Sequence, residues 1–152
     1  MNRVNAIKNI IKNHKNALFI LSNGLTSREA SFFCHNNQSL YLLHAMGEAL
    51  PVGIGVACAL PKLNVVVIEG DGNALMGGAS WVMNKCENLD HYIIENSLYA
   101  TTGNQELPKD IYWPSTSNVI RITDNNFVST PNPPPPNEII KSVMNWLKKN
   151  NF

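Results

Sequence analysis

The sequence predicts an α/β protein with a doubly wound parallel sheet, and three observations support this fold class. Short apolar runs alternate with segments in which apolar residues recur at helical spacing. The run at residues 65–68 is continuously β-branched, which is typical of a parallel strand that is covered on both faces. The length of 152 residues is that of one domain, so we expect residues 1–152 to form a single unit.

Each element follows from its periodicity and from the residues at its ends. Thr26 or Ser27 can cap a helix that begins at Arg28, and Pro61 ends the helix that precedes it. In chain order we expect a helix over residues 2–14, a strand over 17–21, a helix from 28, a strand over 41–43, a helix over 47–60, a strand over 65–68, a helix over 74–87, a strand over 91–94, a long polar loop, a strand over 119–122 and a helix over 138–149. Residues 131–137 are expected to be a proline-rich, extended spacer before the last helix.

Composition and charge restrict the possible partners. With 12 basic and 11 acidic residues the formal net charge is +1, so no bulk field attracts nucleic acid. No segment approaches the length of a membrane span, and the N-terminus lacks a signal-peptide core, so we expect a cytoplasmic protein. Charged residues are only 15%, which suggests that part of the surface faces a partner protein.

Cysteine and histidine patterns indicate no zinc site, iron–sulfur cluster or redox dithiol. The three cysteines are widely spaced, and we expect buried, reduced thiols at Cys34, Cys58 and Cys86. Three histidines have no partner at metal or triad spacing, and we expect structural or surface roles for His14, His35 and His91.

The sharpest local feature is Gly70-Asp71-Gly72, directly behind the β-branched run and ahead of a predicted helix. In a doubly wound sheet Asp71 lies at the carboxyl edge, where ligands bind, and the glycines permit a sharp turn and close backbone approach. The N–H groups that follow can face an anion while the carboxylate binds a hard cation, so Mg²⁺ with a diphosphate fits both. The alternative is an Asp-Gly turn that only caps the helix.

A second feature favours the cation. Asn96 ends the next predicted strand, 25 positions after Asp71, a spacing of one helix plus one strand. Asn96 is therefore expected beside Asp71 on the neighbouring strand end. An amide oxygen and a carboxylate are two of the six oxygen ligands that octahedral Mg²⁺ requires.

With these motifs the sequence resembles the thiamine-diphosphate enzymes, whose diphosphate-binding domain carries Gly-Asp-Gly followed about 25 residues later by Asn-Asn. Within that family it is most similar to the phosphonopyruvate and sulfopyruvate decarboxylases. The resemblance extends over about residues 18–108, through the segments Gly24-Leu25-Thr26-Ser27-Arg28-Glu29, His44-Ala45-Met46-Gly47, Gly70-Asp71-Gly72 and Asn96 to Gln105. It implies that the chain is one thiamine-diphosphate domain with Mg²⁺.

The resemblance also implies roles for individual residues. The implied metal ligands are the side chains of Asp71 and Asn96 and the carbonyl of Leu98. The implied cofactor contacts are Gly70, Gly72 and Asn73 at the diphosphate, the hydroxyls of Thr26 and Ser27, Met46 as the apolar wedge that bends the cofactor, and the His44 carbonyl as acceptor for the aminopyrimidine. Arg28 and Glu48 are the implied candidates for substrate contacts, although Arg28 also fits a solvated helix face.

Three positions depart from the family pattern. Glu95 replaces the first Asn of the Asn-Asn pair, Glu48 replaces a His after the Met motif, and His44 replaces a Gly. These changes fit either an altered substrate or a loss of activity.

The resemblance implies the function as well. The chain would be the cofactor-binding subunit of a two-subunit decarboxylase that converts a phosphonopyruvate- or sulfopyruvate-like 2-oxo acid to CO₂ and an aldehyde. It would hold no catalytic residue of its own, because the activating glutamate belongs to a pyrimidine-binding partner subunit. The alternatives are an inactive or regulatory homologue, or a subunit of another thiamine-dependent 2-oxo acid enzyme.

Overall fold

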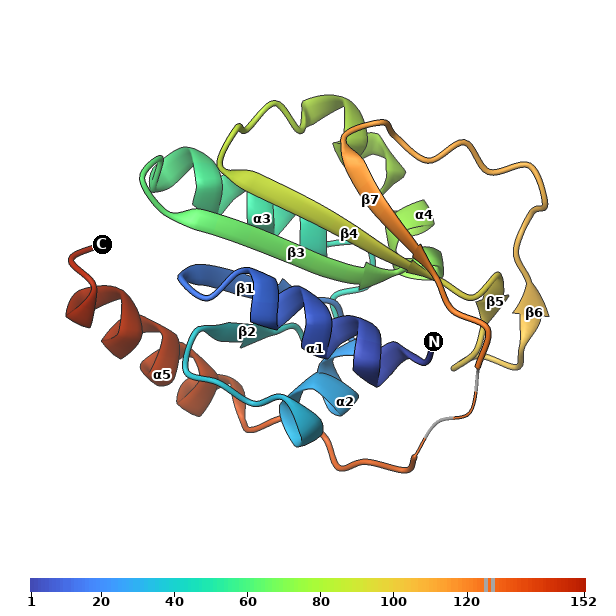
Figure 1. Ribbon diagram of the computed structural model, residues 1–152, viewed down its shortest axis with the longest axis horizontal. Helices are drawn as coiled ribbons and strands as arrows, with labels where there is room; N and C mark the ends of the chain where they lie inside the picture. Colours follow the sequence, from blue (N-terminus) through green and yellow to red (C-terminus); the bar gives the residue numbers. More distant parts are fainter. Residues whose placement is uncertain (125, 127) are drawn as a thin grey trace.

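The computed structural model describes residues 1–124, 126 and 128–152. Its centre is a parallel sheet of five strands in the order β2-β1-β3-β4-β7 (Figure 1). The strands are β1 (Ala17–Leu21), β2 (Ser39–Tyr41), β3 (Asn64–Gly70), β4 (Leu89–Glu95) and β7 (Ser117–Arg121). A separate antiparallel pair is formed by β5 (Leu98–Tyr99) and β6 (Gln105–Glu106). The predicted parallel α/β fold is confirmed.

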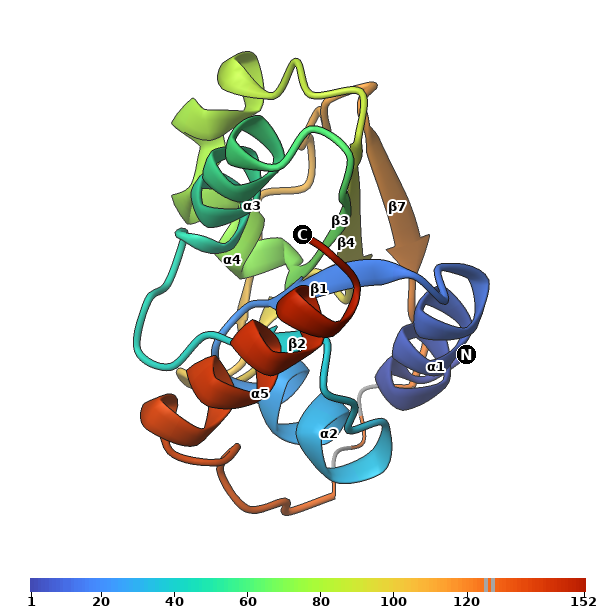
Figure 2. The ribbon, with the colours of Figure 1, turned by 90° about the vertical axis from the view of Figure 1, so that its left-hand side faces the viewer.

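Helices cover both faces of the sheet (Figure 2). They are α1 (Arg3–Asn13), α2 (Leu25–Phe33), α3 (Ala49–Ala59), α4 (Asp71–Met76), α5 (Pro136–Lys149) and the 3₁₀ helix η1 (Gly78–Met83). In Figure 2, α1 and α2 lie on one side of the sheet, and α3, α4 and α5 lie on the other. The sheet is therefore the middle layer of three.

Alternate residues of β1 pack into two different hydrophobic clusters. Phe19 joins the cluster on the α1 and α2 side, whereas Leu18 and Ile20 join the cluster on the α3 side. All five residues of β1 are buried. Burial on both faces explains why the apolar run is continuous rather than alternating.

The strand order determines where a crevice opens. From β1 the chain first crosses to β2 on one side, and then to β3, β4 and β7 on the other. This reversal lies between β1 and β3, and open α/β sheets bind ligands outside the carboxyl ends of the strands at such a point. Those ends are Leu21 and Gly70.

The expected start of the second helix is wrong. α2 begins at Leu25 rather than at Arg28, because Gly24 turns the chain with a φ of 79° and occupies the N-cap position. Neither expected cap acts as one, since both lie inside the first turn. The Ser27 hydroxyl instead donates to the Leu21 carbonyl oxygen at 3.0 Å.

The helix expected over residues 74–87 is shorter and divided. α4 begins at Asp71 and ends at Met76, and η1 follows after Gly77. A Cβ at Gly77 would lie 2.4 Å from the Gly47 carbonyl oxygen, so this close approach requires glycine where the helix ends. Smaller differences are β2, which lies two residues before the expected 41–43, and α5, which begins at Pro136.

The expectation of buried thiols is wrong for Cys58, which is exposed, with its Sγ 3.5 Å from that of Cys86; Cys34 and Cys86 are half-buried. His91 has the structural role that was expected of it. It is fully buried, its Nε2 lies 2.7 Å from Glu69 Oε1, and its Nδ1 lies 2.8 Å from the Ser117 hydroxyl. Within the described ranges, no helix is both long enough and apolar enough to cross a bilayer.

Candidate cofactor site

A cavity opens at the carboxyl ends of β1, β3 and β4, at the reversal of strand order. It is lined by Arg3, Ser22, Asn23, Gly24, Leu25, Thr26, Met46, Gly70, Asp71, Gly72, Asn73, Ile94, Asn96, Leu98, Tyr99, Ala100 and Thr101. The structure thus brings together most of the residues named from the sequence, namely Thr26, Met46, Gly70, Asp71, Gly72, Asn73, Asn96 and Leu98.

Asp71 is the centre of the cavity's polar wall. Its Oδ1 accepts from the Gly72 N–H at 2.8 Å, and its Oδ2 accepts from the N–H groups of Asn96 at 2.8 Å and Ser97 at 2.6 Å. The expected proximity of the two strand ends is therefore confirmed, and Gly70 pairs with Ile94 in the sheet.

Burial dominates the electrostatics of this carboxyl group. Asp71 is 3% exposed. Desolvation raises the pKa of Asp71, the three N–H donors lower it, and nearby Glu95 raises it, with a net upward shift. The fold thus holds a carboxylate at some cost in free energy, and a cation bound in the cavity would offset that cost.

Asn96 and Leu98 line the same cavity as Asp71. The Asn96 Oδ1 accepts from the Leu98 N–H at 3.2 Å across a turn in which Ser97 has a φ of 61°. Carboxylate, amide and carbonyl oxygens are the ligands that Mg²⁺ prefers. In residues 1–124, 126 and 128–152 there is no cluster of three His, Cys, Asp or Glu side chains that could hold a metal. Asp71 supplies a carboxylate, Asn96 a side-chain amide and Leu98 a backbone carbonyl to the lining of one cavity, and oxygens of these kinds fit a hard cation.

Gly72 allows an aromatic ring to close over the turn. A Cβ at this position would lie 2.8 Å from two ring carbons of Tyr99, inside any ordinary carbon contact. The second glycine of the motif therefore makes room for Tyr99, a lining residue that the sequence did not single out. The Gly72 N–H, expected to face a phosphate, is used by Asp71.

Asn73 connects the motif to the turn that carries Met46. Its Oδ1 accepts from the Gly47 N–H at 2.8 Å, and its Nδ2 donates to Asn23 Oδ1 at 2.7 Å. Gly47 has a φ of 83° and contacts Gly77. These contacts fix the backbone beside Met46, whose side chain lines the cavity.

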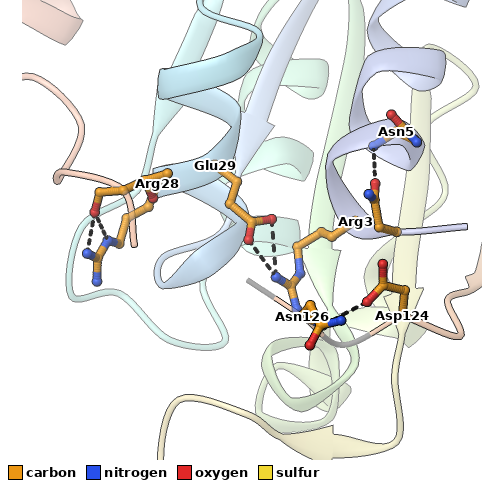
Figure 3. Close-up of polar contacts among 8 residues, drawn as sticks. Arg3, Asn5, Arg28, Glu29, Asp124 and Asn126 are labelled. Atoms are coloured by element: carbon orange, nitrogen blue, oxygen red, sulfur yellow. Dashed lines mark hydrogen bonds and ion pairs between the residues drawn. The ribbon is translucent and has the colours of Figure 1, made fainter. Parts of the chain in front are cut away.

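Four of the residues named from the sequence lie outside this cavity. Ser27, Arg28 and His44 line an adjacent pocket, and Glu48 lines a third, mainly apolar one next to Met46. The Ser27 hydroxyl is used by β1, as described above. The Arg28 guanidinium donates from Nε to the Thr130 carbonyl oxygen at 3.0 Å, as drawn in Figure 3.

The structure adds two polar residues that the sequence did not single out. Ser22 follows β1, and its buried hydroxyl has no hydrogen-bond partner among the described residues. Arg3 reaches the cavity from α1 and pairs with Glu29. Arg3 belongs to no local motif, because only the fold brings the N-terminus of α1 to this edge of the sheet.

Comparison with known proteins decides the family. The family described as "Thiamine pyrophosphate enzyme, C-terminal TPP binding domain" matches residues 22–132, which include every strand of the sheet except β1. The chain belongs to this thiamine pyrophosphate enzyme family. The matched segment contains Asp71 and Asn96, and it excludes Arg3.

Curated relatives of this thiamine pyrophosphate domain include two kinds of decarboxylase. A phosphonopyruvate decarboxylase of Streptomyces hygroscopicus is 38% identical over 107 residues, which is 68% of this chain and 26% of the relative. A sulfopyruvate decarboxylase subunit beta of Methanocaldococcus jannaschii is 36% identical over 108 residues, which is 68% of this chain and 57% of the relative.

A third relative has a different activity. The 2-oxoglutarate synthase subunit KorB of Archaeoglobus fulgidus is 42% identical over 65 residues, which is 41% of this chain and 24% of that protein. The aligned part of the chain thus spans between about a quarter and somewhat over half the length of these relatives.

Proposed function

We propose that this chain is the thiamine-diphosphate- and Mg²⁺-binding subunit of a two-subunit 2-oxo acid decarboxylase, acting on a substrate like phosphonopyruvate or sulfopyruvate. The observation that carries the proposal is the Asp71 carboxylate, buried at the reversal of strand order and contacted by the N–H groups of Asn96 and Ser97. The similarity to two kinds of decarboxylase supports the reaction class.

The residues present fit the cofactor's anionic end. Mg²⁺ would bind the oxygens of Asp71, Asn96 and Leu98. The diphosphate would lie against Thr26 in the first turn of α2 and against the Ser22 hydroxyl, which has no acceptor among the described residues. Met46, which lines the same cavity, would contact the bend of the cofactor.

When bound, thiamine diphosphate supplies a carbon nucleophile that adds to the 2-oxo group and accepts the electron pair released with CO₂. This chain would orient that nucleophile by fixing the two backbone turns that border the cavity. Asn73 holds the Met46–Gly47 turn, and Tyr99 covers Gly72. Arg28 lies in an adjacent pocket, where its guanidinium is proposed to bind the substrate's acidic tail, and Glu48 lies in another pocket, as a proposed contact for a different part of the substrate.

A partner subunit is proposed to complete the site. In our proposal the partner binds the aminopyrimidine near the His44 carbonyl and supplies the activating glutamate. The similarity to sulfopyruvate decarboxylase subunits named beta supports a two-subunit enzyme. The exposed apolar side chains of Met76, Val82 and Met83 provide a surface for such a partner.

The decisive experiment is calorimetric titration with thiamine diphosphate, with and without Mg²⁺, on the chain and on its complex with a co-expressed partner. We expect Mg²⁺-dependent binding that is lost in Asp71→Ala and kept in Asp90→Ala, a control at an exposed aspartate on β4. The complex should then release CO₂ from phosphonopyruvate or sulfopyruvate. Absence of Mg²⁺-dependent binding in both preparations would refute the proposal.

A second candidate function is a subunit of another thiamine-dependent 2-oxo acid enzyme, favoured by the similarity to 2-oxoglutarate synthase. The two candidates differ in where the electrons go. The complex would reduce a viologen dye in the presence of a 2-oxo acid and coenzyme A if it were an oxidoreductase. A decarboxylase would release the aldehyde without reducing the dye.

A further inference from the structure

Arg3 is an unusual residue for its position in the fold. It is the first residue of α1, lies outside the segment that matches the family, and is 8% exposed. The N-terminal turn of a helix carries positive partial charge, which disfavours a cation there. No acidic residue occupies the first turn of α1 to compensate.

The partner of Arg3 is also buried. Glu29 on α2 is 2% exposed, and Arg3 Nη1 lies 3.1 Å from Glu29 Oε1 and 3.2 Å from Oε2. Figure 3 shows the arginine side chain extending from α1 to the carboxylate on α2. A buried ion pair seldom repays its desolvation, so stability alone is a weak reason for placing two charges here.

The pair leaves most of the guanidinium available for a ligand. Both contacts with Glu29 use Nη1, and among the described residues Nε and Nη2 donate to no acceptor. The guanidinium has five N–H donors in a rigid fork that suits phosphate oxygens. Arg3 borders the same cavity as Asp71 and Thr26.

The N-terminus is held in place, which fixes the position of Arg3. The Asn2 side chain caps α1 by accepting the Asn5 N–H at 2.9 Å, and Asn2 forms a parallel bridge with Asp124. The Thr123 N–H donates to the Met1 carbonyl oxygen at 3.3 Å. The residues before Arg3 are thus attached to the segment after β7, at the carboxyl edge of the sheet.

We propose that Arg3 is a diphosphate-binding residue, and that Glu29 orients its guanidinium toward the cavity. This inference rests on the proposed function, because the ligand is the diphosphate of the same cofactor. Diphosphate carries more negative charge than one Mg²⁺ neutralises, and Asp71 adds another. Among the described residues that line the cavity, Arg3 is the one with a cationic side chain, and it would balance this charge. Charge-assisted hydrogen bonds of this kind are the strong ones.

The test compares three variants by calorimetric titration with Mg²⁺ and thiamine diphosphate, in the preparation that binds it, whether chain or complex. Arg3→Met with Glu29→Gln removes both charges and keeps the volume, so it avoids leaving a buried carboxylate unpaired. Glu29→Gln alone keeps the cation. Lys12→Met removes an exposed cation from the last turn of the same helix and is the control.

We expect the double variant to bind at least about tenfold more weakly, with a shallower dependence of affinity on salt. Glu29→Gln and Lys12→Met should bind within about threefold of the unmodified protein. Unchanged affinity in the double variant would overturn the role of Arg3 while leaving the cofactor site intact. An equal loss in Glu29→Gln would do the same, because the amide oxygen still accepts from Arg3 Nη1 and the cation is kept. No binding by the unmodified protein would instead refute the proposed function, and this inference with it.

Discussion

Gly53 lies on the face of α3 that packs directly against the sheet, and we predict that Gly53→Ala destabilises the protein. A Cβ at this position would lie 2.3 Å from Val67 Cγ2 and 3.3 Å from Leu89 Cδ1. Carbon atoms in contact are normally about 3.5–4.0 Å apart. Val67 is fully buried on β3 and its β-branched side chain is stiff, so it cannot move aside and the added methyl group would push α3 away from the sheet.

The magnitude follows from two opposing effects. Overpacking a buried site costs about 1–3 kcal/mol, and replacing Gly by Ala within a helix favours folding by about 0.5–1 kcal/mol. We therefore expect a net loss of about 1–2 kcal/mol in the free energy of unfolding. Gly55 on the same helix is the matched control, because it is exposed and a Cβ there would meet nothing within 4 Å. Gly55→Ala should gain about 0.5–1 kcal/mol.

Equilibrium urea unfolding, followed by circular dichroism, measures both changes. The strain is relieved if Val67 loses its methyl groups, so Gly53→Ala with Val67→Ala should be destabilised by less than the sum of the single changes. Equal stability of Gly53→Ala and Gly55→Ala would refute the reasoning. Additive effects in the double variant would show that the strain lies elsewhere.

Three further predictions concern contacts away from the cofactor cavity. Asn88 Nδ2 donates to three carbonyl oxygens at and after the end of α3, at 2.8–3.2 Å. Asn88→Ala should therefore lower the free energy of unfolding by about 1–3 kcal/mol. A urea midpoint equal to that of the unmodified protein would contradict this. The sulfurs of Cys58 and Cys86 lie 3.5 Å apart, so the two residues should form a disulfide in oxidised glutathione. Mass spectrometry of the intact protein should then show the loss of two hydrogen atoms, whereas Cys58→Ser should carry a glutathione adduct instead. Glu69 Oε1 and His91 Nε2 form a buried pair 2.7 Å apart. Glu69→Ala should therefore lower the free energy of unfolding by about 3–5 kcal/mol, and replacement of both residues by Leu should lower it by less in the same urea assay. An equal loss in the single and the double variant would contradict this prediction.

The sheet could be predicted from the sequence because its signals are local. Continuous apolar runs mark strands that are buried on both faces, and all five sheet strands begin and end within two residues of the expected positions. The proximity of Asp71 and Asn96 could be predicted for the same reason, since adjacent parallel strands bring their carboxyl ends to one edge.

The differences arise where contacts between distant segments decide the structure. The break after α4 depends on Gly77 meeting Gly47, and no helical pattern within residues 74–87 contains that information. The spacing of the histidines said nothing of the pair formed by His91 and Glu69, because the pairing comes from strand register. Arg3 could not be placed at the cavity until α1 was packed against α2.

Several features around the cavity lower stability in the absence of ligand. Burial raises the pKa of Asp71, so the ionised carboxylate is disfavoured by folding, and this loss is complete once the pH exceeds its raised folded-state pKa. Ser97 has a left-handed φ, the buried Ser22 hydroxyl has no partner among the described residues, and Arg3 is buried beside a helix N-terminus. Such costs persist when the surrounding fold enforces them, and they concentrate at ligand sites. A metal ion would stabilise the carboxylate, and phosphate oxygens would accept from Ser22 and Arg3. The ligand that explains the geometry would therefore also stabilise the fold, in proportion to the logarithm of its concentration over its dissociation constant.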